Sequence, residues 1–146
     1  MPLYPPGSWL HAGTRPAGTG TLTAGRFTVP AEGGRFDRHL HDDDELWFIA
    51  EGRAKILLEG RERYVGPGDV VLTPAGTVHD VLEVYGTLRG FFTETGHPVG
   101  GRAGHLHADP ADAAGHDVPG LPLPADFPAD FPADFPADSP AGSQEV

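Results

Sequence analysis

Short stretches of alternating apolar and polar residues are the feature that most constrains the fold of this chain. They fill residues 21–96, and Gly, Pro or Asp residues separate them at short intervals. Gly 21 and Pro 16 make up a quarter of the 146 residues, which favours many turns over long helices. No window long enough for a helix carries a helical apolar stripe. The sequence therefore predicts an all-β sandwich or barrel.

Eight candidate strands follow from this alternation. They are Thr21–Val29, Asp37–His41, Leu46–Ala50, Ala54–Glu59, Arg63–Val65, Val70–Thr73, His79–Tyr85 and Leu88–Thr95. The strand at 46–50 is apolar on both faces, so both faces need cover. We expect one face to line the barrel interior, where Trp47 is a candidate for pocket lining or for plain core packing. Leu46 and Phe48 on the other face are expected to meet a second layer or the partner of a homodimer.

The regions outside the alternating pattern differ from it in composition. We expect an irregular N-terminal arm over residues 1–20, the barrel over 21–96, and a loop or extension over 97–123. Residues 124–146 form a Pro-rich tail in which Pro-Ala-Asp-Phe occurs three times, at 124–127, 128–131 and 132–135. Pro at every fourth position blocks helix propagation, so a disordered or extended tail is expected. The repeated phenylalanines could dock elsewhere or be passive, and we expect deletion of residues 110–146 to leave the fold intact.

Charge and composition exclude several classes of protein. The net charge is -11 and Lys55 is the only lysine, so the chain has no basic face for nucleic acid or an anionic membrane. Without cysteine, neither disulfides nor thiolate metal sites can form. No apolar run approaches a membrane span and no signal peptide is visible, so we expect a cytoplasmic protein with a small-molecule partner.

Four side chains in two segments have the pattern of a metal site. His39 and His41 are two residues apart, so they share one face of a strand and can converge on one ion. Glu45 has the same parity, and its burial would be costly without a metal partner. His79 supplies a further imidazole from a second strand. Alternatively, the histidines flank an acidic turn at the surface and the glutamate lies at a strand end in water.

The two segments resemble the two motifs of the cupin superfamily, and the chain is similar to its small single-domain members. The matching positions of the first motif are Gly33, His39, His41, Glu45 and Gly52, and those of the second are Gly68, Pro74, Gly76 and His79. The resemblance implies a single jelly-roll barrel, the double-stranded β-helix. It also implies one divalent metal held by His39, His41, Glu45 and His79, while the framing glycines act through chain geometry.

The chain departs from the second motif at Glu83, where the family usually has asparagine. In a regular strand, Glu83 and Tyr85 share the face of His79. Both are therefore candidate catalytic residues, with Glu83 acting on protons near the metal. The alternative is a bulge that turns Glu83 outward to solvent.

Oxygen and nitrogen donors with an open coordination position are typical of catalytic rather than structural metal sites. They favour Fe, Mn, Ni or Zn. The resemblance implies a metal-dependent enzyme acting on a small organic molecule by dioxygenase, isomerase, cyclase or lyase chemistry. The alternatives are a non-catalytic metal- or ligand-binding module and an accessory protein that uses the tail. We expect the second His-x-His pair, His105 and His107, to lie at the surface.

Overall fold

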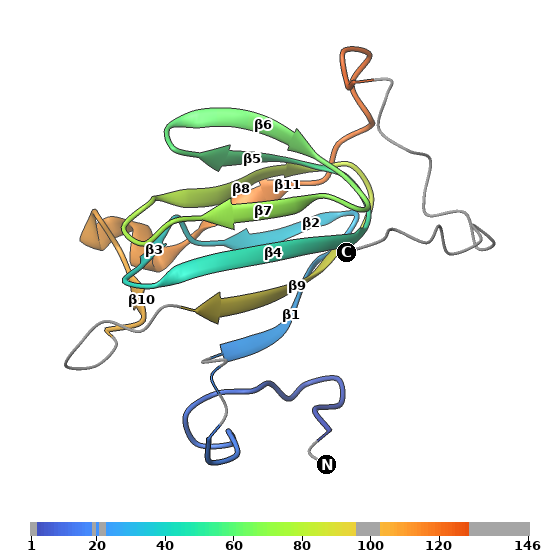
Figure 1. Cartoon of the computed structure of the whole chain (residues 1–146). Coiled ribbons are helices and arrows are strands. Elements are labelled where there is room, and N and C mark those ends of the chain that lie inside the picture. The colour runs from blue at the N-terminus through green and yellow to red at the C-terminus, as the bar shows by residue number, and fades with distance from the viewer. Residues whose placement is uncertain (1–2, 19, 21–22, 96–102, 129–146) are drawn as a thin grey trace, which may run out of the picture.

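Nearly all the regular structure of the computed structural model consists of short strands; the structure describes residues 3–18, 20, 23–95 and 103–128 (Figure 1). In chain order the elements are β1 (Thr23–Val29), β2 (Gly33–Phe36), β3 (Leu40–His41), β4 (Asp44–Glu51), β5 (Ala54–Leu58), β6 (Arg61–Val65), β7 (Val70–Thr73), β8 (His79–Val84), β9 (Leu88–Thr95), β10 (His105–Leu106), a 3-10 helix (Pro110–Ala114) and β11 (His116–Pro119). The all-β prediction is confirmed.

The strands form the two layers of a jelly roll. One sheet has the order β1-β9-β4-β7, and a second has the order β6-β5-β8. The free side of β8 continues the second layer through two bridges. His39 pairs with His79 at one end of β8, and Gly120 pairs with Val84 at the other. The first bridge brings β3 and β10 to β8, and the second brings β11 and β2.

Apolar side chains from both layers meet between the sheets. The buried cluster comprises Val29, Trp47, Ile49, Ala54, Ile56, Val65, Val71, Val81, Val84, Leu88 and Val118. Within β4 and β5 the buried residues alternate with more exposed ones, as a strand with one face in the core requires. This alternation fixes the register, because a one-residue slip would turn Trp47 and Ile49 towards solvent.

Two glycines of the first motif allow close approaches between backbone segments. Gly33 has φ 97° and Gly52 has φ 74°, a conformation that favours glycine. A Cβ atom at Gly33 would lie 2.4 Å from the carbonyl oxygen of Val118, and one at Gly52 would lie 2.2 Å from that of Thr87. The expected role of these glycines in chain geometry is confirmed for both positions.

The segment that follows the barrel pattern corrects one expectation. We expected a loop or extension over residues 97–123, but its described part, residues 103–123, contains β10, the 3-10 helix and β11. β11 pairs with β2, and its Val118 is 1% exposed within the core. The pattern missed β2 and β11 because each is short and its partner is distant in sequence. The expectation of an intact fold after deletion of residues 110–146 is therefore not supported.

The outer face of the four-stranded sheet is apolar over several strands. Its exposed side chains include Phe48, Val70, Leu72 and Phe91. The described part of the N-terminal arm touches this sheet at Leu10, which pairs with Ala24 of β1. Within the described ranges, no helix has the length and apolar character that a membrane span requires. The expected disorder of the tail concerns residues that lie mostly outside the described ones.

Candidate metal centre

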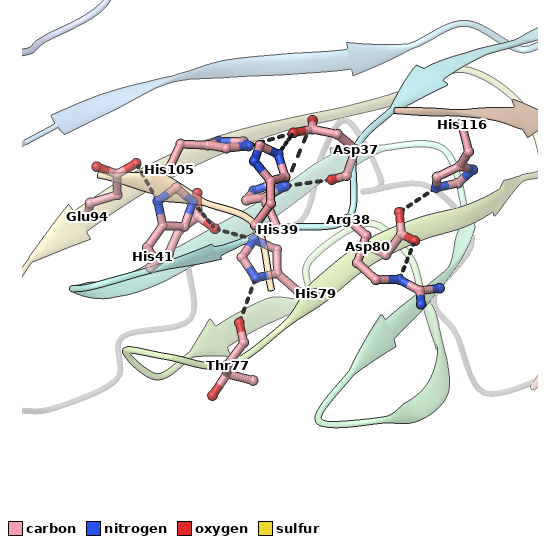
Figure 2. Close-up of polar contacts among 12 residues, drawn as sticks. Asp37, Arg38, His39, His41, Thr77, His79, Asp80, Glu94, His105 and His116 are labelled. Carbon is pink, nitrogen blue, oxygen red and sulfur yellow. Dashed lines mark hydrogen bonds and ion pairs between the residues drawn. The ribbon is translucent and has the colours of Figure 1, made fainter. Parts of the chain in front are cut away.

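The four predicted donors lie together at one end of the barrel. His39 and His41 come from β3 and the residue before it, Glu45 from the start of β4, and His79 from the start of β8. One donor atom from each residue lies within 4.8 Å of those of the others, and all four residues are buried. Figure 2 shows His39, His41 and His79 turned towards one another. The alternative of two surface histidines is therefore wrong.

The Glu45 carboxylate lies between the Nε2 atoms of two imidazoles. Its Oε2 atom is 3.1 Å from Nε2 of His79 and 3.6 Å from Nε2 of His41. Oε2 nevertheless has no hydrogen-bond donor among the described residues, and Nε2 of His79 has no hydrogen-bond partner there either. Buried polar atoms without a hydrogen-bond partner lower the stability of the fold unless another group, such as a cation, interacts with them.

Backbone carbonyl oxygens orient two of the imidazole rings. Nδ1 of His39 lies 2.6 Å from the carbonyl oxygen of Asp37, and Nδ1 of His79 lies 3.1 Å from that of Thr77 (Figure 2). A carbonyl oxygen accepts only from a protonated nitrogen, so in the neutral form of either ring these contacts would leave a lone pair on Nε2. This is the arrangement by which a backbone group fixes the tautomer of a metal-ligating histidine.

Burial keeps His39 in the neutral form that can bind a metal. Burial and then the charge of the neighbouring His79 lower the pKa of His39 to about 3. Neutral imidazoles and an ionised carboxylate form a donor set that suits a divalent first-row ion. The residues present therefore fit a metal, and His39, His41, Glu45 and His79 would hold it.

A cavity of about 210 Å³ opens onto three of these four residues, His39, His41 and Glu45. Its lining contains the four aromatic residues Phe27, Phe36, Trp47 and Phe92, together with Asp37, His39, His41, Glu45, Glu94 and His105. The sequence identified Trp47 as a pocket-lining candidate, and the structure places it there. Its ring also contacts the ring of His79, with centroids 5.3 Å apart. The cavity therefore combines apolar walls with donors and carboxylates at one end.

The second His-x-His pair joins the edge of this cavity. β10 pairs with β3, which sets His105 opposite His41. Nε2 of His105 and Nε2 of His107 lie 2.6 and 2.8 Å from the same oxygen of Asp37. The His105 ring also stacks on His39, with centroids 3.8 Å apart. Although the His105 side chain is 44% exposed, the pair is part of the site's surroundings rather than a separate surface feature.

Glu94 is a further cavity residue that sequence reasoning missed. It is 4% exposed on β9, directly opposite Glu45 of β4. Its Oε1 atom lies 3.8 Å from Nδ1 of His41, so the carboxylate stands behind a metal donor (Figure 2). Only the β4–β9 register reveals this position. Asp37, by contrast, shares parity with His39 and His41, and the motif itself could have identified it.

The catalytic roles predicted for Glu83 and Tyr85 are not supported by the geometry. In the β5–β8 pairing, Ile56 faces Val81 while Lys55 faces Glu83, so Leu82 is the extra residue of a β-bulge. The bulge reverses the parity that placed Glu83 on the face of His79.

Glu83 instead binds Lys55 at 3.3 Å and accepts a hydrogen bond from the Tyr85 hydroxyl at 2.5 Å. Burial and the Glu83 carboxylate together raise the pKa of Tyr85 well above its ordinary value. Neither residue lines the cavity beside the metal donors.

Comparison with known protein families places a cupin domain model on residues 25–87. An uncharacterised protein of Sinorhizobium fredii, y4oW, is 39% identical over 71 residues, which are 49% of this chain and 33% of that protein. Dimethylsulfoniopropionate lyase DddQ of Ruegeria pomeroyi is 45% identical over 42 residues, 28% of this chain and 21% of the lyase. The chain thus spans a third or less of these relatives.

Solved structures show the same fold. The crystal structure of DddQ from Ruegeria pomeroyi matches with a TM-score of 0.50 and 28% identity, over 58% of this chain and 43% of that one. The polyketide cyclase RemF from Streptomyces resistomycificus matches with a TM-score of 0.51 and 24% identity, over 70% of this chain and 69% of that one. At that identity the RemF match supports the fold alone.

Proposed function

The chain contains a cupin domain, and from this premise we propose that it is a metal-dependent enzyme acting on a small organic molecule. The observation that carries the proposal is the convergence of His39, His41, Glu45 and His79 on one point at the end of a cavity. The buried Oε2 atom of Glu45 and the buried Nε2 atom of His79 have no hydrogen-bond partner among the described residues, a cost that a bound ion would remove.

The proposed ion is a single divalent transition metal, Fe, Mn, Ni or Zn. When bound, it supplies a Lewis acid for an oxygen atom of the substrate. The protein orients the ligating side chains and keeps His39 in its neutral form. Backbone carbonyls at Asp37 and Thr77 hold two rings with Nε2 towards the ion, and burial keeps His39 neutral and ready to bind. A divalent ion that takes more than four ligands would keep a position for the substrate beside these four side chains.

The size and lining of the cavity support a small substrate. Its volume of about 210 Å³ lies below the roughly 300–1,000 Å³ of sites for drug-sized ligands. The substrate is therefore a molecule of few heavy atoms, with a polar group that reaches the metal and an apolar or cationic part that contacts the aromatic walls. Phe27, Phe36, Trp47 and Phe92 suit either, because aromatic faces attract cations as well as apolar groups.

Among the reaction classes, we favour lyase chemistry. The support is the likeness to the lyase DddQ both in sequence and in structure. In an elimination, a base beside the bound substrate takes a proton from one carbon, the C–H electron pair forms the C=C bond, and the leaving group departs from the adjacent carbon. Glu94 and His105 line the cavity next to the metal donors and are the candidates for this step. They replace Glu83 and Tyr85 in that role.

The test compares metal-loaded and metal-free protein on a panel of small carboxylates, including dimethylsulfoniopropionate, with and without O₂. We expect turnover that requires metal, persists without O₂ and releases an alkene product. Turnover only in the presence of O₂ would point to an oxygenase instead. Saturable binding of a panel member without any turnover would support the non-catalytic binding module.

A further inference from the structure

The first Asp-Phe unit of the repetitive tail lies on an aromatic surface far from the metal site. Its Phe127 ring is half-buried against Tyr64 and Tyr85, with centroid distances of 4.8 and 5.9 Å. The guanidinium carbon of Arg53 lies 5.9 Å from the same ring centroid. We refer to Arg53, Tyr64 and Tyr85 as the Tyr64 surface. The Tyr64 pair is tilted and the Tyr85 pair is edge-on, and together with a cation over the ring they are specific contacts rather than general apolar packing.

The aspartate of the same unit also has a partner on this surface. The Tyr64 hydroxyl donates to Oδ1 of Asp126 at 3.5 Å, a long hydrogen bond. The backbone N–H of Phe127 donates to the carbonyl oxygen of Pro124 at 3.1 Å, so the four residues form a turn. The Tyr64 surface thus contacts both distinctive side chains of the Pro-Ala-Asp-Phe unit, while the turn sets them side by side.

A fixed anchor holds the tail close to this surface. The N–H of Leu121 donates to the carbonyl oxygen of Val84, just after β11, so the chain reaches the end of β8 beside Tyr85. In Figure 1 this orange segment lies at the opposite end of the barrel from β3 and β10. The docked unit is therefore separate from the metal centre.

The sequence places two further copies of the same unit immediately after the first, with Phe131 and Phe135 at the matching positions. From Leu121, the three phenylalanines are 6, 10 and 14 residues along the chain. Loop closure scales roughly as the three-halves power of loop length, so docking by the second or third unit is only about twofold or fourfold weaker. The three units are chemically identical and differ little in the entropic cost of loop closure, so one can replace another on the surface.

We propose that the Tyr64 surface is a recognition site for the Asp-Phe unit, and that the tail of this chain supplies three interchangeable ligands for it. Arg53 and the two tyrosines select an aromatic ring next to a carboxylate. Docking of one unit holds the tail against the barrel and leaves the other two units of the same chemistry undocked.

The test uses the full chain with labelled Phe and Tyr rings, observed by NMR. In the unmodified chain we expect NOEs between Tyr64 and Phe127. In Phe127→Ala we expect them between Tyr64 and Phe131, because the second unit takes the surface. In the triple variant Phe127→Ala/Phe131→Ala/Phe135→Ala, the Tyr64 and Tyr85 ring signals should shift. The double variant Phe131→Ala/Phe135→Ala is the matched control and should resemble the unmodified chain.

A second measurement adds an acetylated and amidated Pro-Ala-Asp-Phe-Pro-Ala-Asp-Phe peptide to the triple variant. The peptide should return the Tyr64 and Tyr85 signals to their original positions, while the same peptide with alanine for both phenylalanines should not. Ring signals in Phe127→Ala that coincide with those of the triple variant would overturn the exchange of units. A triple variant that folds with its normal melting temperature yet does not respond to the peptide would overturn recognition itself. If the triple variant does not fold, the Phe127→Ala result decides alone.

Discussion

Burial of the predicted metal ligands is unfavourable for the stability of the fold, and a bound metal ion would offset this. Glu45 is 4% exposed, and its Oε2 atom points at the Nε2 atoms of His41 and His79. A buried carboxylate in this position destabilises the fold unless a cation neutralises it. The motif spacing predicted all four donors, because strand parity and the turn before His79 are local properties. The neighbours Glu94 and His105 depend on pairing between distant strands and were not predictable.

Replacement of Glu45 by glutamine should have opposite effects with and without metal. In chelator, Glu45→Gln should unfold at the same or a higher temperature, since a buried charge is removed, with a gain of about 1–3 kcal/mol at most. With metal, it should be less stable than the unmodified chain because a charged ligand is lost. Thermal unfolding in both conditions measures this. Glu62→Gln, at a 64% exposed side chain, is the control and should change neither curve.

Strands β8, β2 and β11 have features that the local sequence pattern does not predict. Parity along 79–85 placed Glu83 beside the metal, but one extra residue in β8 reversed the face. No residue in the sequence marks this bulge. Likewise, β2 and β11 are four residues each and exist because they pair with each other across the chain. Their contact depends on Gly33, whose lack of a side chain admits the Val118 carbonyl.

The pairing of β11 with β2 predicts that the C-terminal segment is part of the folding unit. A chain ending at residue 109 loses β11 and the buried Val118, and should show a large drop in melting temperature or fail to fold. A chain ending at residue 123 keeps both and should unfold near the original temperature. Val118→Ala alone should cost about 2 kcal/mol. Equal melting temperatures for the two truncations would contradict this role of β11.

His116 at the start of β11 predicts a pH dependence. Burial lowers its pKa, but the hydrogen bond to the buried Asp80 carboxylate, at 2.7 Å, outweighs this and raises the pKa above the ordinary value. The same carboxylate also binds Arg38 at 3.2 Å.

The pKa of His116 is higher in the folded than in the unfolded state. The pairing of His116 with Asp80 therefore stabilises the fold fully below about pH 6.5, and this stabilisation is lost as pH rises through the pKa of the folded state. The ring is 38% exposed, so it amounts to about 1 kcal/mol or less. Chemical unfolding of the unmodified chain and His116→Gln between pH 5.5 and 8.5 tests it. The difference between the two should shrink as pH rises, whereas a constant difference would contradict the assignment.

The whole molecule is the jelly roll that the alternating pattern and the two motifs predicted. The fold was predictable from the sequence because two buried sheet faces require period-2 alternation, and because glycines are needed where backbone segments approach closely. The outer face of the strand at 46–50 was expected to need cover, and the structure leaves Phe48 exposed there beside the exposed Val70, Leu72 and Phe91 of neighbouring strands. For the tail, the sequence pattern left two alternatives open, namely that its phenylalanines dock on another surface or that the tail is passive.

The homodimer expected from the apolar strand at 46–50 stays a prediction. If a second copy covers the outer face of the four-stranded sheet, sedimentation velocity should give a dimer for the unmodified chain. Phe48→Glu/Phe91→Glu should shift it to monomer without lowering the melting temperature of the barrel. The exposed pair Glu32→Gln/Glu59→Gln serves as the control. A monomer at all concentrations for the unmodified chain would contradict the prediction.

The metal content of the purified chain tests the central claim most directly. After reconstitution with Fe, Mn, Ni or Zn and removal of free ions, elemental analysis should find one ion per chain. The double variant His39→Ala/His79→Ala should hold almost none. His11→Ala/His116→Ala, which removes histidines outside the cavity, should keep the full amount. Undiminished metal in the His39/His79 variant, or no metal in the unmodified chain, would contradict the assignment.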